Sequence, residues 1–178
     1  MVFSSFVFLL AFLPIVLLLY YLCPARLRNL VLLVFSLAFY AWGEPVYVLI
    51  MLFSIVFDYA NGRLIEHFKN KNCPGKAKAA LIVDLCGNLA ILGFFKYTDF
   101  VIGSINSITG AGLSLLHIAL PIGISFYTFQ TMSYTIDVYR GEVAAQKNIL
   151  TFATYVTLFP QLIAGPIVRY LDVERQLQ

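Results

Sequence analysis

Long apolar runs, separated by short polar or Gly- and Pro-containing segments, dominate this sequence. A helix that crosses a bilayer needs about 20 mostly apolar residues. Lipid offers no partner for backbone N–H and C=O groups, so each spanning segment must satisfy them internally, as a helix does. The pattern predicts an all-α, polytopic transmembrane bundle of five or six membrane segments. The expected segments are residues 3–22, 29–43, 46–65, 79–96, 116–139 and a sixth stretch at 148–168.

Composition supports a membrane protein. Of the 178 residues, 61% are hydrophobic and 12% are charged, whereas soluble domains carry about 25% charged residues. The net charge of +3 is scattered along the chain, which argues against nucleic-acid binding. The three cysteines are widely spaced without a CxxC pair, so neither a disulfide nor a metal site is expected.

The basic residues predict an orientation. No Lys or Arg precedes Arg26, so the first apolar run lacks the basic start of a signal peptide and is expected to be a retained helix. Residues 63–78 hold five basic residues and one Glu, while the loop around Glu44 holds none. The positive-inside rule places the Arg26 loop and residues 63–78 in the cytoplasm and the N-terminus outside. Residues 97–115, with isoleucines at helical spacing, suit a short interfacial helix on the outer surface, or else a plain loop.

The stretch "LPIGISFYTFQTMSYTIDVYRGE" (120–142) puts polar groups in an apolar segment. Gln130, Ser133, Tyr134 and Asp137 are spaced i, i+3, i+4 and i+7, which aligns them on one helical face. Because an acidic group in the bilayer interior is costly, this face should meet other helices or a water-filled cavity. Two interpretations stay open: a functional lining, or hydrogen bonds that hold helices together.

Two interpretations are also open for the charged groups near this segment and in the segment at 79–96. Asp137 and Arg140 are spaced for a local ion pair, or Arg140 snorkels to the interface. Asp84 and Asn88, at i and i+4, form a second inward polar pair, unless Asp84 sits near the cytoplasmic interface and pairs with a Lys.

The last apolar stretch, "TFATYVTLFPQLIAGPIVRY" (151–170), interrupts its own helix. Pro160 and Gly165-Pro166 break the hydrogen-bond ladder, and Gln161 places an amide at the first break. Irregular backbone at membrane depth must be covered by protein or line a cavity. A re-entrant segment near a substrate path is one interpretation, and a Pro-kinked spanning helix is the other.

No catalytic residue is assigned. His117, in "LLHIALP", is expected at the outer start of the helix at 116–139, and no acid or nucleophile lies near it in the sequence. No phosphate-binding loop, nucleophile elbow or HExxH pattern occurs.

Four stretches resemble one family. "MVFSSFVFLLAFLPIVLLLYYL", "RNLVLLVFSLAFYAWGEP", "LPIGISFYTFQTMSYTIDVYRGE" and "FPQLIAGPIVRY" are similar to the N-terminal part of bacterial membrane-bound O-acyltransferases of the alginate O-acetylation type. The similarity extends over essentially all of residues 1–178. It implies a multi-pass enzyme of the bacterial inner membrane with a funnel or tunnel through it.

The resemblance implies passage of an acyl group from a cytoplasmic donor, acetyl-CoA or an acyl carrier, to an extracytoplasmic acceptor. That acceptor is an exopolysaccharide such as alginate, a cell-wall polymer, or a periplasmic acetyltransferase partner. No bound cofactor is expected. In this family the catalytic His lies in a later Arg- and Trp-rich segment, so the chain is expected to be an inactive N-terminal fragment that supplies scaffold and tunnel wall. The candidate substrate-path residues are Gln130, Ser133, Tyr134, Asp137, Arg140 and Gln161. The alternative function is a small transporter or channel component, since broken helices with polar groups at midplane also mark transporters.

Overall fold

The computed structural model describes residues 5–110, 112–164 and 168–177, and every regular element in these ranges is a helix. This confirms the all-α prediction. The elements, in chain order, are a π-helical segment η1 (Phe8–Phe12), α1 (Leu13–Leu22), α2 (Ala25–Gly43), α3 (Val48–Asn70), α4 (Pro74–Thr109), α5 (Ile124–Arg140), α6 (Ile149–Thr157), α7 (Phe159–Ala164) and α8 (Tyr170–Leu177).

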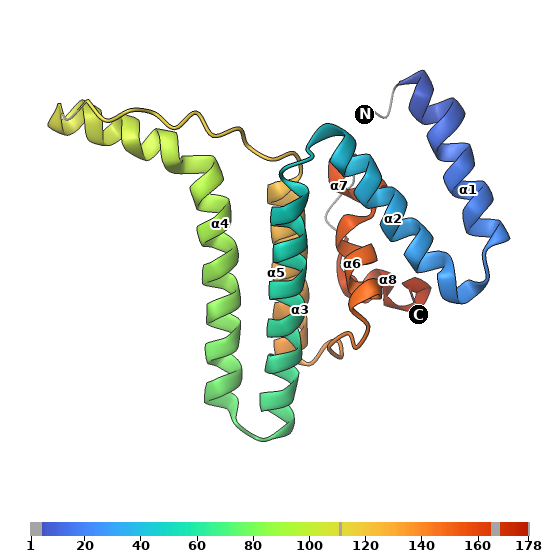
Figure 1. Ribbon diagram of the computed structural model, residues 1–178. Coiled ribbons are helices and arrows are strands. Elements are labelled where there is room, and N and C mark those ends of the chain that lie inside the picture. Colours follow the sequence, from blue (N-terminus) through green and yellow to red (C-terminus); the bar gives the residue numbers. More distant parts are fainter. Residues whose placement is uncertain (1–4, 111, 165–167, 178) are drawn as a thin grey trace.

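Helices α3, α4 and α5 pack against one another, with α3 and α5 in the middle of the molecule and α4 on one side (Figure 1). A short turn joins α3 to α4, and the two run antiparallel. Helix α6 packs on α2 and α3, and α1 lies outermost, against α2. The α3–α4 turn and the loop between α5 and α6 lie toward the same end of the bundle, so the basic residues of 63–78 share an end with Arg140 (Figure 1).

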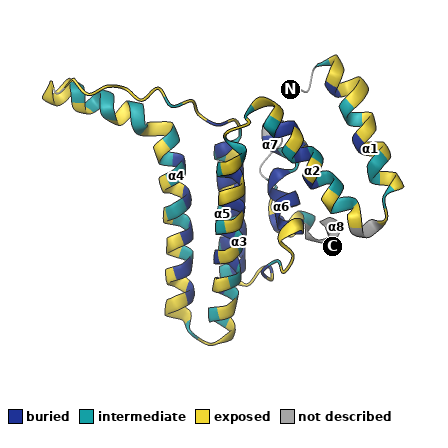
Figure 2. Ribbon diagram, viewed as in Figure 1, coloured by how far each residue is buried: buried dark blue, intermediate teal, exposed yellow. Residues whose placement is uncertain are grey.

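Two described helices, α3 and α4, are long and apolar enough to cross a membrane, and the segments Phe8–Leu22 and Leu27–Gly43 are shorter apolar helices. The count of five or six membrane segments stays a prediction. Large apolar side chains such as Leu18, Trp42 and Phe53 are exposed. Exposed positions run along α1, α2, α3 and α4 (Figure 2). Such faces suit contact with lipid, which is as apolar as they are.

Helix α4 extends well past the expected end at residue 96. It changes direction before its last turns, which run sideways to the bundle (Figure 1). The hydroxyl of Thr98 donates to the carbonyl of Phe94, and such back-bonding bends helices. The helix predicted within 97–115 is present as far as Thr109; of the described residues after it, none up to Leu120 is helical.

Helix α5 begins at Ile124, eight residues after the expected start at 116. Pro121 and Gly123 explain the difference. Gly123 has φ of 77°, a left-handed conformation that favours glycine, and a Cβ there would lie 2.8 Å from the carbonyl oxygen of Leu162. The chain therefore turns at Gly123, against Leu162 of α7, before it enters α5.

Candidate functional site

Three members of the predicted polar face are buried on α5. Gln130, Tyr134 and Asp137 are 4%, 0% and 1% exposed, while Ser133 is only partly buried. The buried three face residues of the chain after α5, as the hydrogen bonds below show. The prediction that this face would turn away from lipid is confirmed for them.

Gln130 joins α5 to the broken C-terminal segment. Its Nε2 donates to the carbonyl of Tyr155, at 3.0 Å, and to Oε1 of Gln161, at 3.4 Å. The structure thus brings together Gln130 and Gln161, two of the candidate residues that lie 31 positions apart.

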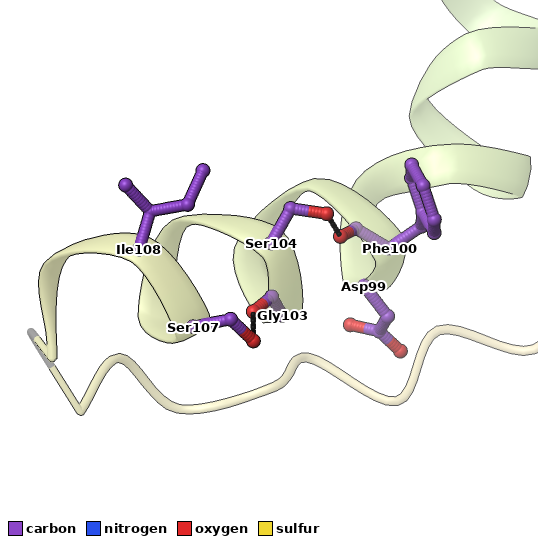
Figure 3. A pocket seen from close by; sticks show the side chains of 6 residues that line it. All are labelled: Asp99, Phe100, Gly103, Ser104, Ser107 and Ile108. Atoms are coloured by element: carbon purple, nitrogen blue, oxygen red, sulfur yellow. Dashed lines mark hydrogen bonds between the residues drawn. The ribbon is translucent and has the colours of Figure 1, made fainter.

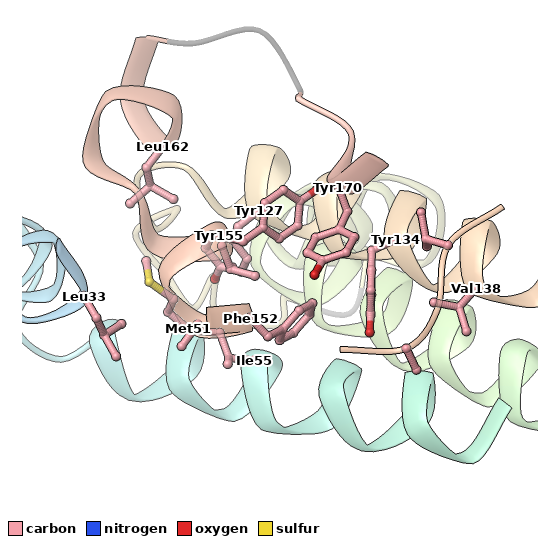
Figure 4. Packing of buried hydrophobic residues seen from close by; sticks show 14 of the residues in the cluster. Leu33, Met51, Ile55, Tyr127, Tyr134, Val138, Phe152, Tyr155, Leu162 and Tyr170 are labelled. Carbon is pink, nitrogen blue, oxygen red and sulfur yellow. The ribbon is translucent and has the colours of Figure 1, made fainter. Parts of the chain in front are cut away.

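Tyr134 holds the loop that follows α5. Its hydroxyl accepts a hydrogen bond from the backbone N–H of Gln146, at 2.8 Å. Its ring packs against Phe152 and Tyr170, with centroids 4.8 and 5.1 Å apart, and Tyr155 closes the group against Tyr170 (Figure 4). The Nε2 of Gln146 also donates to the Tyr170 hydroxyl, at 2.7 Å. Aromatic packing and two hydrogen bonds therefore fix α5 to α6 and α8.

Asp137 makes its ion pair with Arg169. The Arg169 Nη2 lies 2.5 Å from Asp137 Oδ1 and its Nε lies 3.3 Å from Oδ2, a two-pronged contact. The same Nη2 also donates to Glu142, at 2.9 Å. These hydrogen bonds to Asp137 raise the pKa of Arg169 above its ordinary value, so the guanidinium stays charged.

The predicted pair between Asp137 and Arg140 is wrong. Arg140 is exposed and its guanidinium approaches Glu142 instead, at 3.8 Å. Asp137 points into the bundle while Arg140, three residues on, points outward, in keeping with the snorkelling alternative. We call the set Gln130, Tyr134, Asp137, Tyr155, Gln146, Gln161 and Arg169 the α5 network.

A hollow of about 260 Å³ lies beside the Asp137–Arg169 end of the network. Glu66, Lys69, Val138 and Glu142 are among its lining residues. Lys69 Nζ donates to the carbonyls of Val138 and Tyr139, at 3.3 and 2.7 Å. A cation at these C-terminal carbonyls complements the negative end of the α5 dipole. Charged groups of both signs thus gather at this end of the bundle.

The last apolar stretch is broken, as predicted, but the break precedes Pro160. Helix α6 ends at Thr157, Leu158 adopts φ −51° and ψ 109°, and α7 starts at Phe159. Pro160 therefore occupies the first turn of α7, where its missing N–H costs nothing. The predicted second interruption, Gly165-Pro166, lies outside the described residues.

Asp84 and Asn88 point inward, as expected. Asn88 Nδ2 donates to the backbone carbonyl of Asp84 and to Oδ1 of Asp58, at 3.1 and 2.6 Å. Asp84 accepts from the Thr135 hydroxyl, at 2.7 Å. The alternative, in which Asp84 pairs with a Lys, is wrong: within the described ranges no ion pair involves Asp84.

His117 does not start a helix. It is exposed in the segment that leads to α5, with φ of 48°. The nearby end of α4 carries an open hollow of about 550 Å³, lined by residues that include Asp99, Ser104 and Ile108 (Figure 3). Asp99 Oδ1 accepts from the N–H of Leu116, at 2.9 Å, which ties the returning segment to α4. The carboxylate is thus engaged in holding the backbone.

Sequence reasoning missed Arg169 and Asp58. Arg169 is the second-last residue of the quoted motif "FPQLIAGPIVRY", and a lone cation after an apolar run is a signal for a distant acidic partner. Asp58 lies within the apolar stretch of α3, where an acid is unexpected enough to indicate a buried polar contact.

Comparison with known proteins decides the family. A probable alginate O-acetylase of Pseudomonas syringae pv. tomato is 47% identical over 99% of this chain. The chain is homologous to the alginate O-acetylases. A further probable alginate O-acetylase, of Azotobacter vinelandii, is 46% identical over 99% of the chain, and a peptidoglycan O-acetyltransferase of Helicobacter pylori is 33% identical over 100% of the chain.

The resemblance to membrane-bound O-acyltransferases is thereby confirmed. The chain covers 34%, 36% and 39% of these three relatives, about a third of each. No family model and no solved structure matches the chain.

Proposed function

We propose that this chain is the N-terminal membrane part of an O-acetyltransferase that moves an acetyl group from a cytoplasmic donor to an extracytoplasmic polymer. The observation that carries the proposal is the 46–47% identity to alginate O-acetylases over 99% of the chain. Alginate is the proposed acceptor because those relatives are more similar to the chain than the peptidoglycan enzyme, at 33%. The donor is acetyl-CoA or an acyl carrier, the membrane is the bacterial inner membrane, and the N-terminus lies outside.

Within that enzyme the α5 network positions the broken segment α6–α7. Gln130 and Asp137 each bond to chain beyond residue 154, and Tyr134 bonds to the loop before α6. The buried, directly paired state of these three side chains supports a positioning role over direct contact with water. Ser133, partly buried, and Arg140, exposed, remain candidates to line the path itself.

A chimera tests the proposal. The aligned segment of the Pseudomonas syringae relative is replaced by residues 1–178, and cells lacking their own alginate O-acetylase produce alginate with this chimera. We expect acetate esters on the polymer. A matched chimera with Asp137→Ala should insert in the membrane and yield few esters. A well-folded chimera that adds no acetate to alginate would contradict the proposal.

A further inference from the structure

A second polar cluster lies where α3, α4 and α5 meet, apart from the α5 network. Asp58 of α3 and Asp84 of α4 are both 0% exposed, and Asn88 Nδ2 of α4 donates both to Asp58 Oδ1 and to the backbone carbonyl of Asp84, which brings the two acids together. Asp58 is ten residues from the start of α3 and twelve from its end, so the pair sits near the middle of a helix long enough to span the membrane.

Each carboxyl group has one occupied and one free oxygen. Asp58 Oδ1 accepts from Asn88 Nδ2 at 2.6 Å, and Asp84 Oδ2 accepts from the Thr135 hydroxyl at 2.7 Å. The other oxygens, Oδ2 of Asp58 and Oδ1 of Asp84, are buried and accept no hydrogen bond from the described residues.

No cation among the described residues balances the pair, since neither aspartate takes part in an ion pair there. Two tyrosines of the hydrophobic core, Tyr127 of α5 and Tyr40 of α2, are the titratable groups to consider beside the pair. They are 0% and 3% exposed, and neither hydroxyl has a hydrogen-bond partner in the described chain.

Two neighbouring buried carboxylates, both ionised and without a counter-charge, would be strongly unfavourable inside a membrane. A positive charge must therefore sit between them. Two free carboxylate oxygens are too few for Ca²⁺, which takes six to eight oxygen ligands. No group of three or more His, Cys, Asp or Glu side chains that could hold a metal ion occurs in the part of the chain that the structure describes.

We propose that Asp58 and Asp84 form a proton-binding site in the membrane, in which one proton is shared between Asp58 Oδ2 and Asp84 Oδ1. This proton gives both free oxygens a partner and leaves the pair with a single negative charge. The hydrogen bonds from Asn88 and Thr135 stabilise that charge. Because the two acids come from α3 and α4, proton binding fastens those helices together and to α5.

Infrared spectroscopy of the full chain in lipid nanodiscs tests the site. At neutral pH the wild type should show the C=O band of a protonated carboxylic acid, with a shift on exchange into D₂O. In Asp58→Asn and Asp84→Asn the new amide donates to the remaining carboxylate in place of the proton, so the band should disappear. Asp172 is exposed, so Asp172→Asn is the control and should keep the band. Absence of the band in wild type, its survival in both single variants, or its loss on adding Na⁺ at constant pH would overturn the proposal.

The pH dependence of stability gives a second readout that does not depend on the variants folding. Isolated Asp side chains release their proton near pH 4, so above about pH 5 the folded chain would hold one proton more than the unfolded chain. Stability then falls as pH rises, and the folded-to-unfolded ratio drops about tenfold per pH unit until the pair itself ionises. Wild-type unfolding in denaturing detergent between pH 6 and 8 should show this slope. A flat profile would overturn the proposal, and a slope shared by a folded Asp84→Asn variant would do the same.

Discussion

Close packing of α3 on α5 depends on the absence of a side chain at Gly62. A Cβ at this position would lie 2.9 Å from Cε1 of Tyr134 and 3.2 Å from its hydroxyl oxygen. The ring cannot retreat easily, because Phe152 and Tyr170 pack against it and its hydroxyl bonds to Gln146. Gly62→Ala therefore forces α3 away from α5 or displaces Tyr134.

The magnitude follows from two opposing effects. Overpacking a well-filled core costs about 1–3 kcal/mol, while replacing Gly by Ala inside a helix favours folding by about 0.8–1 kcal/mol. Gly62→Ala should range from nearly neutral to about 2 kcal/mol destabilising. Gly93→Ala in α4 is the matched control, because no atom lies within 4 Å of a Cβ there. It should stabilise the protein by up to about 1 kcal/mol.

Unfolding in mixed detergent micelles, followed by circular dichroism, measures both variants. The free energies of unfolding of the two variants should differ by about 1–3 kcal/mol, with Gly62→Ala the less stable. In a Tyr134→Leu background the shorter side chain frees the space, so the gap should shrink. Equal stability of the two variants, or a difference unchanged by Tyr134→Leu, would show that Tyr134 does not restrict the space at position 62.

Three further predictions concern charge, orientation and catalysis. Arg169→Gln leaves the buried Asp137 without its cation, so it should lower the yield of folded protein far more than Arg140→Gln does. The double variant Asp137→Asn/Arg169→Gln should recover much of that loss. Equal yields from the two single arginine variants would count against the Asp137–Arg169 pair. A Cys at Asn70, which ends α3, should resist an impermeant thiol reagent added outside intact cells, and labelling from outside would reverse the proposed orientation. Residues 1–178 alone should transfer no acetyl group, because general-base catalysis needs a positioned residue and His117 is exposed. Acetyl transfer that disappears in His117→Ala would show that His117 is catalytic.

Local patterns predicted the helices well and their partners poorly. The apolar runs located α2 and α3 to within a few residues, and the spacing of Gln130, Tyr134 and Asp137 identified a buried face. Helix α5 starts later than its apolar run predicts, because the chain turns at Pro121 and Gly123 before it becomes helical. The segment expected to end at residue 96 is instead part of α4, which continues to Thr109 and bends on the way.

Long-range pairing was beyond sequence reasoning. Asp137 has a possible partner three residues away in Arg140, yet it binds Arg169, which is 32 residues away. The fold makes that choice, because Asp137 faces the bundle and Arg140 faces out. Asp58 likewise meets Asn88 only because α3 and α4 pair antiparallel. Helical periodicity identifies a face, but packing decides what lies opposite it.

Transfer of acetate across a sealed membrane tests the central claim most directly. Inverted inner-membrane vesicles carrying the chimera would be loaded with unacetylated alginate, and labelled acetyl-CoA would be added outside, on the original cytoplasmic face. We expect labelled acetate esters on the enclosed polymer, and almost none in vesicles with the Asp137→Ala chimera. Enclosed alginate that stays unlabelled in vesicles with a folded chimera, or that gains label only when the donor is enclosed with it, would show that the protein does not pass acetate across the membrane.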